Sequence, residues 1–223
     1  MKTSSIFGLC LMLVLLGGCN YLVYPLYLVS PVMPDKTEDA EYKGMPDSTV
    51  AVVVFADPAI TYDYPNLREQ ISSVVGYQLS KNVDKVKAVT AERITRFQDL
   101  NADWEGMDKT VLGKKLKADF VLNVSVVTFT TLEPGSTYLH RGYLTAQVTL
   151  HKCSLPEKEA CVWNGGEIQI KYPEKDTTGG DLNGDDREIR NKTILTFAEV
   201  LAKKFYKHKI KTDPDELDEE EKK

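Results

Sequence analysis

Runs and alternations of apolar residues predict strands at five places along the chain. The stretch Thr49–Ala56, TVAVVVFA, is apolar almost throughout, which is typical of a strand covered on both faces. A shorter strand is expected at 86–89. Three further stretches alternate apolar and polar side chains: 118–133, 143–152 and 167–172. They predict an antiparallel meander with one buried face, and the change of phase near Val126 and Val127 predicts a β-bulge.

Apolar residues spaced three or four positions apart predict four helices. The first begins after Asp63 and Pro65, which are helix-start signals. Its apolar stripe consists of Leu67, Ile71, Val74, Val75 and Leu79. Ile94 and Phe97 mark a second, short helix, and Asp108 is placed to cap a third.

The last predicted helix has the clearest signals in the chain. Asp185 and Glu188 fit a capping box at its start. Its apolar stripe consists of Ile194, Phe197, Ala198, Leu201 and Phe205. Several lysines lie near its carboxyl end, where positive charge is favourable. A long amphipathic helix that follows a meander is expected to pack across the sheet.

The order of these elements determines the expected fold class. A strand, a helix and a second strand imply a parallel pair with a right-handed crossover. The meander then adds antiparallel strands. We therefore expect an α+β fold, in which a βαβ unit and a three-stranded meander form one mixed sheet with helices packed on it, including the long carboxyl-terminal helix.

The amino-terminal region raises the question of a membrane span. The run from Thr3 to Pro34 carries no charge and is long enough to cross a bilayer, but adjacent glycines and three prolines interrupt it. The region is more typical of an export signal, which has a positive start (Lys2), an apolar stretch (6–16) and small residues before its cleavage site. The alternative is an uncleaved signal anchor with a buried or coincidental cysteine.

The sequence Leu16-Gly17-Gly18-Cys19 resembles the lipobox of bacterial lipoproteins, in which the cysteine is acylated and becomes the new amino terminus. The resemblance implies a diacylglycerol and an acyl chain on Cys19, and hence attachment to a membrane on its periplasmic side without a spanning helix. The residue at position 20 is asparagine and not aspartate, which favours sorting of the lipoprotein to the outer membrane.

Removal of residues 1–18 would leave 205 of the 223 residues and change the formal charge from -5 to -6, because Lys2 leaves. Nearly all of that charge lies in the tail, with seven acids and two lysines. The body is close to neutral, so its charge does not indicate binding to nucleic acid.

The chain is expected to have four parts: a signal peptide at 1–18, a lipidated arm at 19–48, the α+β domain at 49–211 and an acidic disordered tail at 212–223. Ion or partner binding is the alternative for the tail.

Two of the four cysteines remain after this assignment, because Cys10 lies in the signal and Cys19 carries the lipid. Cys153 and Cys161 are separated by seven residues between two predicted strands, in a chain expected to reach a compartment that permits disulfides. We expect a disulfide between them. Two free thiols or a metal-binding pair are the alternatives.

The order of elements, with VAVVVF at its start and LKADFVLNVSV before the meander, is similar to the amino-terminal domain of the TolB translocation protein. It also resembles the curli secretion lipoprotein and the outer-membrane lipoprotein that activates penicillin-binding proteins. The match is strongest at 117–122, whereas Asn123 replaces the glycine usual in that group. The whole chain further resembles an uncharacterised family of bacterial lipoproteins with DYPNLR after the first strand. These resemblances imply a role in the cell envelope.

No catalytic motif is visible in the sequence. The chain lacks a Gly-x-Ser-x-Gly elbow, a phosphate-binding glycine loop and a His-Glu-x-x-His helix. His140, His151 and His208 lie at positions where exposed or locally bonded histidines are common. We therefore expect no enzymatic activity and no cofactor other than the covalent lipid.

Two stretches are candidates for binding. The loop after the first strand can form a ligand or partner surface, because open α/β sheets bind ligands at such ends. Its candidate residues are Asp57, Tyr62, Asp63, Tyr64 and Arg68. Asp181, Asn183 and Asp185 alternate as calcium ligands do. A plain β-to-α connection and a turn with a helix cap are the respective alternatives.

These observations predict a membrane-anchored periplasmic lipoprotein that binds an envelope protein or serves envelope assembly without enzymatic activity. A lipoprotein that binds a small ligand or calcium is the first alternative. An enzyme with an unrecognised site is the second.

Overall fold

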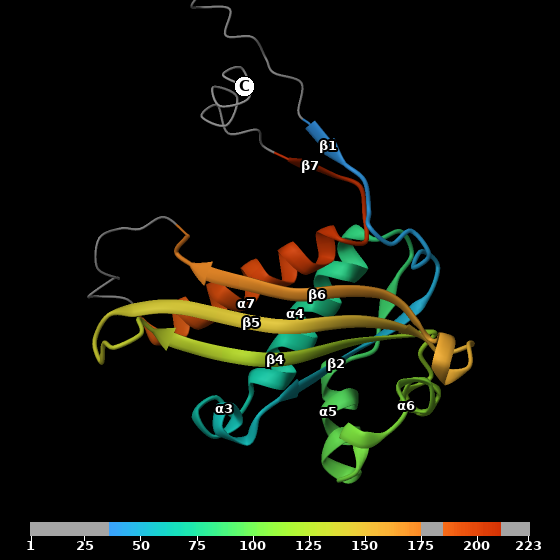
Figure 1. The fold of residues 1–223 in the computed structure, drawn as a ribbon, viewed down its shortest axis with the longest axis horizontal. Helices are drawn as coiled ribbons and strands as arrows, with labels where there is room; N and C mark the ends of the chain where they lie inside the picture. The colour runs from blue at the N-terminus through green and yellow to red at the C-terminus, as the bar shows by residue number, and fades with distance from the viewer. Residues whose placement is uncertain (1–35, 175–184, 211–223) are drawn as a thin grey trace, which may run out of the picture. The chain divides into compact units, whose positions relative to one another are not determined.

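The computed structural model describes residues 36–174 and 185–210, and it has an α+β fold (Figure 1). Five strands form one mixed sheet in the order β3-β2-β4-β5-β6. Strand β2 (Thr49–Ala56) is parallel to β3 (Lys87–Ala88) and to β4 (Phe120–Leu132). Strands β4, β5 (His140–Lys152) and β6 (Cys161–Tyr172) form the antiparallel meander. The predicted combination of a βαβ unit with a meander is confirmed.

Helices lie on both faces of this sheet. On one face, α4 (Leu67–Asn82) and α7 (Asp186–Lys203) pack side by side over the main core (Figure 1). On the other face, α5 (Ala91–Leu100) and α6 (Lys109–Leu116) cover the part of the sheet around β2. The remaining short helices are α3 (Pro58–Asp63), η1 (Trp104–Gly106) and η2 (Glu157–Glu159). Helix α3 was not predicted.

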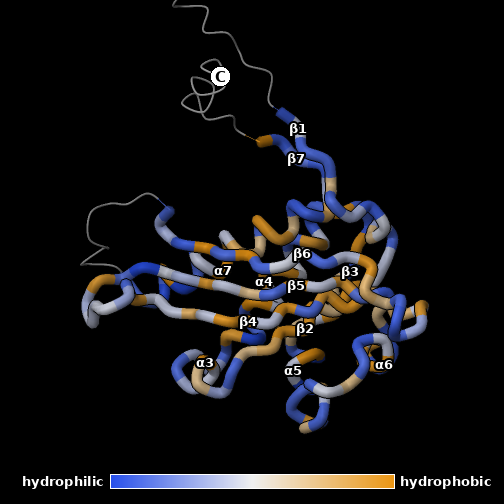
Figure 2. Tube along the Cα trace, in the orientation of Figure 1, coloured by the Kyte–Doolittle hydropathy of each residue, from blue (hydrophilic) through white to orange (hydrophobic). Residues whose placement is uncertain are grey.

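Strand β2 is buried on both faces, as its unbroken apolar sequence predicts (Figure 2). Val50, Val52 and Val54 belong to the core beneath α4 and α7. Ala51 and Val53 belong to the smaller core beneath α5 and α6. The parallel neighbours β3 and β4 therefore flank a strand without a solvent-facing side.

The predicted β-bulge lies in β4. Its pairing with β5 shifts between Val126 and Thr128, so Val127 has no partner in the ladder and is 54% exposed. A second shift occurs between Thr130 and Leu132. The first shift changes the phase of the alternation, so even-numbered residues up to Val126 are buried before it, and Phe129 and Thr131 are buried after it.

Asp185 is the N-cap of α7, at the position where the sequence predicts the helix to begin. The Asp185 side chain accepts a hydrogen bond from the Arg187 backbone N–H at 2.9 Å.

Helix α7 approaches β5 closely at Thr193. A Cβ atom added to Gly142 of β5 would lie only 1.7 Å from Thr193 Oγ1. Glycine at position 142 is therefore what lets the helix approach the strand.

The described residues at 38–174 and 185–208 form one compact unit, which starts before the first predicted strand. The backbone N–H groups of Glu41 and Tyr42 donate to the Lys204 carbonyl, and Glu41 accepts from Trp163 Nε1 at 3.1 Å. The Met45 side chain is completely buried in the main core. Part of the stretch assigned from sequence to the arm thus contributes to the packed structure.

The remaining described residues, 36–37 and 209–210, belong to a second unit. Strand β1 (Lys36–Glu38) pairs with β7 (His208–Ile210) in a two-stranded sheet, of which Glu38 and His208 are counted with the larger unit. No helix within 36–174 or 185–210 has both the length and the apolar character needed to cross a bilayer. The lipobox at 16–19 and the acidic tail lie outside the described residues.

Candidate functional site

The loop after β2 does not gather its predicted site residues into one cluster. Asp57 caps α3 by accepting from the Ala59 N–H at 2.8 Å, and Asp63 is the last residue of that helix. Tyr62 is 86% exposed. Arg68 pairs with Asp99 of α5 at 3.3 Å. These contacts assign local structural roles to Asp57 and Arg68.

Tyr64 is the loop residue that reaches other elements. Its hydroxyl donates to Thr131 Oγ1 at 3.2 Å and accepts from the Thr131 N–H at 3.3 Å. Its ring packs edge-on against Phe129, with 4.7 Å between the ring centroids. The Arg190 guanidinium lies 5.5 Å from the Tyr64 centroid, in cation–π range. Tyr64 therefore links the loop to β4 and α7.

Asp186 completes this group, which we name the Tyr64–Asp186 cluster: Tyr64, Thr131, Asp186 and Arg190. The Asp186 carboxylate accepts from Thr131 Oγ1 and from Arg190 Nη2, the latter at 2.6 Å. Burial alone would raise the pKa of Asp186. The hydrogen bonds from Thr131 and Arg190 and the Arg190 charge outweigh burial, so the pKa lies below its usual value.

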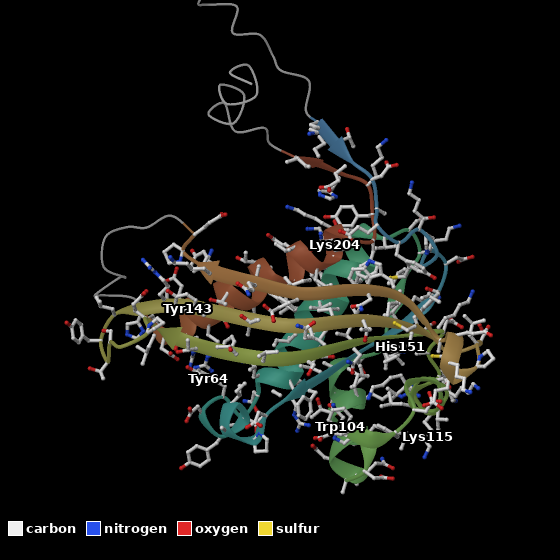
Figure 3. All side chains as sticks on the ribbon, in the orientation of Figure 1. Tyr64, Trp104, Lys115, Tyr143, His151 and Lys204 are labelled. Carbon is white, nitrogen blue, oxygen red and sulfur yellow. The ribbon has the colours of Figure 1, made fainter. Side chains whose placement is uncertain are left out.

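A second polar group lies where the β4–β5 hairpin turns. The side chain of Arg141 is 6% exposed, and its Nη1 pairs with Glu133 Oε2 at 3.0 Å. The Tyr143 hydroxyl lies 3.1 Å from both carboxylate oxygens of Glu133. Tyr64 and Tyr143 lie toward the same end of the sheet, whereas His151 lies toward the other (Figure 3). These paired charges fix the shape of that end.

A groove lies between α4 and α7, and its lining residues Asn66 and Asn191 are near Tyr64 and Arg190 of the Tyr64–Asp186 cluster along the chain. It has a volume of about 590 Å³, and we name it the α4–α7 groove. Its lining residues are Asn66, Glu69, Gln70, Ser73, Val74, Asn191, Ile194 and Leu195. Val74, Ile194 and Leu195 supply apolar surface, and Glu69 is the one ionisable residue in the lining. Gln70 Oε1 is buried and has no hydrogen-bond partner among the described residues.

The candidate calcium residues fall mostly outside the described ranges, because Asp181 and Asn183 lie in 175–184. Asp185 is described, and its side chain caps α7. Within 36–174 and 185–210, no group of three or more histidine, cysteine or acidic residues is arranged to hold a metal ion.

The structure does not show the expected disulfide, and Cys153 and Cys161 are both free thiols in it. His151, not Cys153, lies opposite Cys161 in the β5–β6 ladder. The Cys153 backbone N–H instead bonds to the Asp119 carbonyl. The Cys153 side chain is buried in the core beneath α6, whereas Cys161 is exposed.

This arrangement predicts very different reactivities for the two thiols. Burial, and then the Asp119 charge, raises the pKa of Cys153 to about 11, and the reactive species is the thiolate. With Ellman's reagent at pH 8, we expect Cys161 to react at least a hundredfold faster than Cys153. Urea should remove this difference by unfolding the chain.

Single variants assign the two phases of this reaction. Cys161→Ser should lose the fast phase and Cys153→Ser should keep it. If neither thiol reacts until a reductant is added, the expected disulfide would be correct and the free-thiol arrangement wrong.

The residues that complete the site were not singled out from the sequence. Thr131, Asp186 and Arg190 come from two elements that are far from Tyr64 along the chain. One signal was available, because Asp186 and Arg190 are four residues apart in a predicted helix and can pair. The position of Arg141 had no comparable signal.

Comparisons with known proteins give limited likeness. No protein-family model and no curated protein matches the chain. The PelC dodecamer of Paraburkholderia phytofirmans is 11% identical, with a TM-score of 0.44 over 76% of this chain and 96% of that one. Lipoprotein GNA1162 of Neisseria meningitidis is 15% identical, with a TM-score of 0.45 over 70% and 98%. A putative neuraminyllactose-binding hemagglutinin homolog of Helicobacter pylori is 13% identical, with a TM-score of 0.32 over 83% and 92%. At these values the likeness carries no conclusion about what this chain does.

Proposed function

We propose that this chain is a lipid-anchored lipoprotein on the periplasmic side of the cell envelope, and that it binds a protein partner without catalysing a reaction. The lipobox-like sequence ending at Cys19 supports the anchor, and Asn20 favours the outer membrane. The order of its elements, similar to that of the TolB amino-terminal domain, is in keeping with an envelope role. The anchor and the binding activity are separate parts of the proposal and are tested separately.

The α4–α7 groove carries the binding part of this proposal. Its apolar residues, Val74, Ile194 and Leu195, lie among polar side chains, an arrangement typical of protein contact surfaces. The lining contains the Glu69 carboxylate and no cation. The groove therefore fits a segment of an envelope protein that presents an apolar side chain beside a lysine or arginine.

The two carboxylates with fixed partners, Asp186 and Glu133, support binding more than catalysis. Asp186 is held by Thr131 and Arg190, and Glu133 by Arg141 and Tyr143. A carboxylate already fixed by cationic or hydroxyl donors serves to hold a surface in shape. A preformed surface loses less conformational entropy when it binds.

Site-specific photocrosslinking in intact cells tests the groove. We expect Ser73→p-benzoylphenylalanine to form a discrete adduct with one envelope protein, because position 73 lines the groove and is exposed. Leu195→Lys should reduce that adduct at least tenfold, since it places a cation where the partner is expected to carry one. Leu195→Met should retain it.

The matched control is Gln147→p-benzoylphenylalanine, on the sheet face away from α4 and α7, which should not give the same adduct. An adduct that is equally strong from position 147, or insensitive to Leu195→Lys, would contradict binding through the groove. Absence of any adduct, together with a small molecule retained by the purified protein or heat released on addition of calcium, would favour the corresponding ligand-binding alternative.

A further inference from the structure

The outer edge of β6 is a second surface that the proposed function does not use. Among the residues that the structure describes, no strand pairs with β6 on the side away from β5. Its pairing with β5 is regular from Glu167 to Tyr172, after the shift that involves Gly166. The other end of β6 is approached by Glu41, which accepts from Trp163 Nε1. The regular half is therefore the part open to another strand.

Side chains alternate along this half-strand. Ile168 and Ile170 are buried against the main core, and Glu167 and Gln169 are exposed on the opposite face. An unpaired edge with alternating side chains can accept an added strand through its backbone groups. Charged residues usually limit such pairing, so the arrangement of charge decides which strand fits.

A second copy of β6 fits in one antiparallel register. For the apolar faces of two copies to lie on the same side, the twofold axis must pass midway between the two copies of one residue, which then oppose each other. Centring the axis at Ile168 places Glu167 opposite Gln169. Centring it at Ile170 places Lys171 opposite Gln169. Neither register pairs the opposite charges.

Centring the axis at Gln169 pairs the charges. Glu167 of each copy then lies opposite Lys171 of the other, and Ile168 lies opposite Ile170, with both pairs formed twice. Opposite charges and apolar side chains directly across an antiparallel pair stabilise it. In the single chain Glu167 accepts from Gln147 and Gln169, and Lys171 also interacts within its own chain, so the new pairs would extend an existing polar network.

We propose that the Glu167–Tyr172 edge of β6 is a self-association surface, where two copies pair antiparallel about Gln169 and join their sheets. The partner is a second copy of this chain because its complementary charges are placed symmetrically about one residue. This inference does not depend on the α4–α7 groove, which lies on the helical layer.

Cysteine crosslinking tests the register. Directly opposed residues in an antiparallel pair have Cα atoms about 4.5–5.5 Å apart, within the range of disulfides. In the full-length chain with Cys161→Ser, we expect Gln169→Cys to form a disulfide-linked dimer on mild oxidation. Glu167→Cys should do so only when mixed with Lys171→Cys. Gln147→Cys, one strand away from the edge, is the control for random contact.

Charge exchange tests the same pairs without oxidation. Glu167→Lys and Lys171→Glu should each weaken the dimer at least tenfold in sedimentation equilibrium, because each variant opposes like charges twice. The double exchange should restore the affinity to within about threefold. Unchanged melting temperatures would show that the variants remain folded.

Two results would overturn the proposal. One is a yield of crosslinked dimer from Gln169→Cys no higher than from Gln147→Cys. The other is a dimer affinity of the double variant, Glu167→Lys with Lys171→Glu, that is as low as the affinity of the single variants. Neither the cysteine crosslinking nor the dimer affinity depends on whether the groove adduct forms. Loss of the dimer likewise does not change the adduct, so each proposal can fail without the other.

Discussion

Truncation of Phe197 to alanine is expected to destabilise the domain by about 3–5 kcal/mol, which is the usual range for a fully buried phenylalanine. Phe197 is completely buried in the main core, on the face of α7 that packs against the sheet. Alanine would leave a cavity in that contact, in addition to losing the transfer free energy of the ring. The free energy of unfolding, measured by urea titration and circular dichroism, is the direct test.

Two variants of α7 provide the comparison. Leu195→Ala, two residues away, removes three side-chain carbons where Phe197→Ala removes six. Leu195 is also 36% exposed, so a cost of at most about 1 kcal/mol is expected, well below half of that of Phe197→Ala. Phe197→Leu keeps much of the volume and should cost less than Phe197→Ala. Equal losses in Phe197→Ala and Leu195→Ala would contradict the described packing of α7 on the sheet.

The strands and helices of the domain followed from local sequence because burial leaves a local pattern. Strand β2 is apolar at nearly every position and is buried on both faces, whereas β5 alternates and has one buried face. Asp108 and Asp185 were identified as caps from their position alone, and both accept a backbone N–H in the first turn. The bulge in β4 was visible because it changes the phase of the alternation.

The pairing of residues across elements did not follow in the same way. The disulfide was expected because Cys153 and Cys161 lie seven residues apart between two predicted strands, but the β5–β6 register places His151 opposite Cys161. Register depends on the second shift in that ladder, between Leu150 and His151, which has no clear sequence signal. Nearness in sequence was therefore a poor guide to nearness of the thiols.

The candidate site shows the same limit. Tyr64 was selected as part of an aromatic loop, but its role depends on Thr131 and Arg190, which only the packing of α7 against β4 brings close. Likewise, Met45 was assigned to the arm because its neighbours are charged, yet it is buried in the main core. A single apolar residue in a polar stretch has no periodicity that could reveal its burial.

Replacement of Cys19 by alanine is expected to abolish lipid labelling completely and to remove the protein from the outer-membrane fraction. The reason is that the thiol is the proposed acylation site, and each buried CH₂ of an acyl chain contributes about 0.8 kcal/mol of membrane binding. Cleavage before Cys19 would also be lost, so the variant should migrate as the larger precursor. Labelling with an alkyne fatty acid, followed by membrane fractionation and immunoblotting, measures all three effects.

Matched cysteine variants separate acylation from other effects of losing a thiol. Cys10→Ala lies within the proposed signal and Cys161→Ser lies in β6, so both should keep normal labelling, size and partitioning. Globomycin, which blocks lipoprotein signal cleavage, should give the wild-type chain the precursor size of Cys19→Ala while leaving the diacylglycerol on the Cys19 thiol, so that lipid labelling persists. Unchanged size and partitioning in Cys19→Ala would instead show that the apolar segment itself holds the chain at the membrane, as an uncleaved signal anchor would.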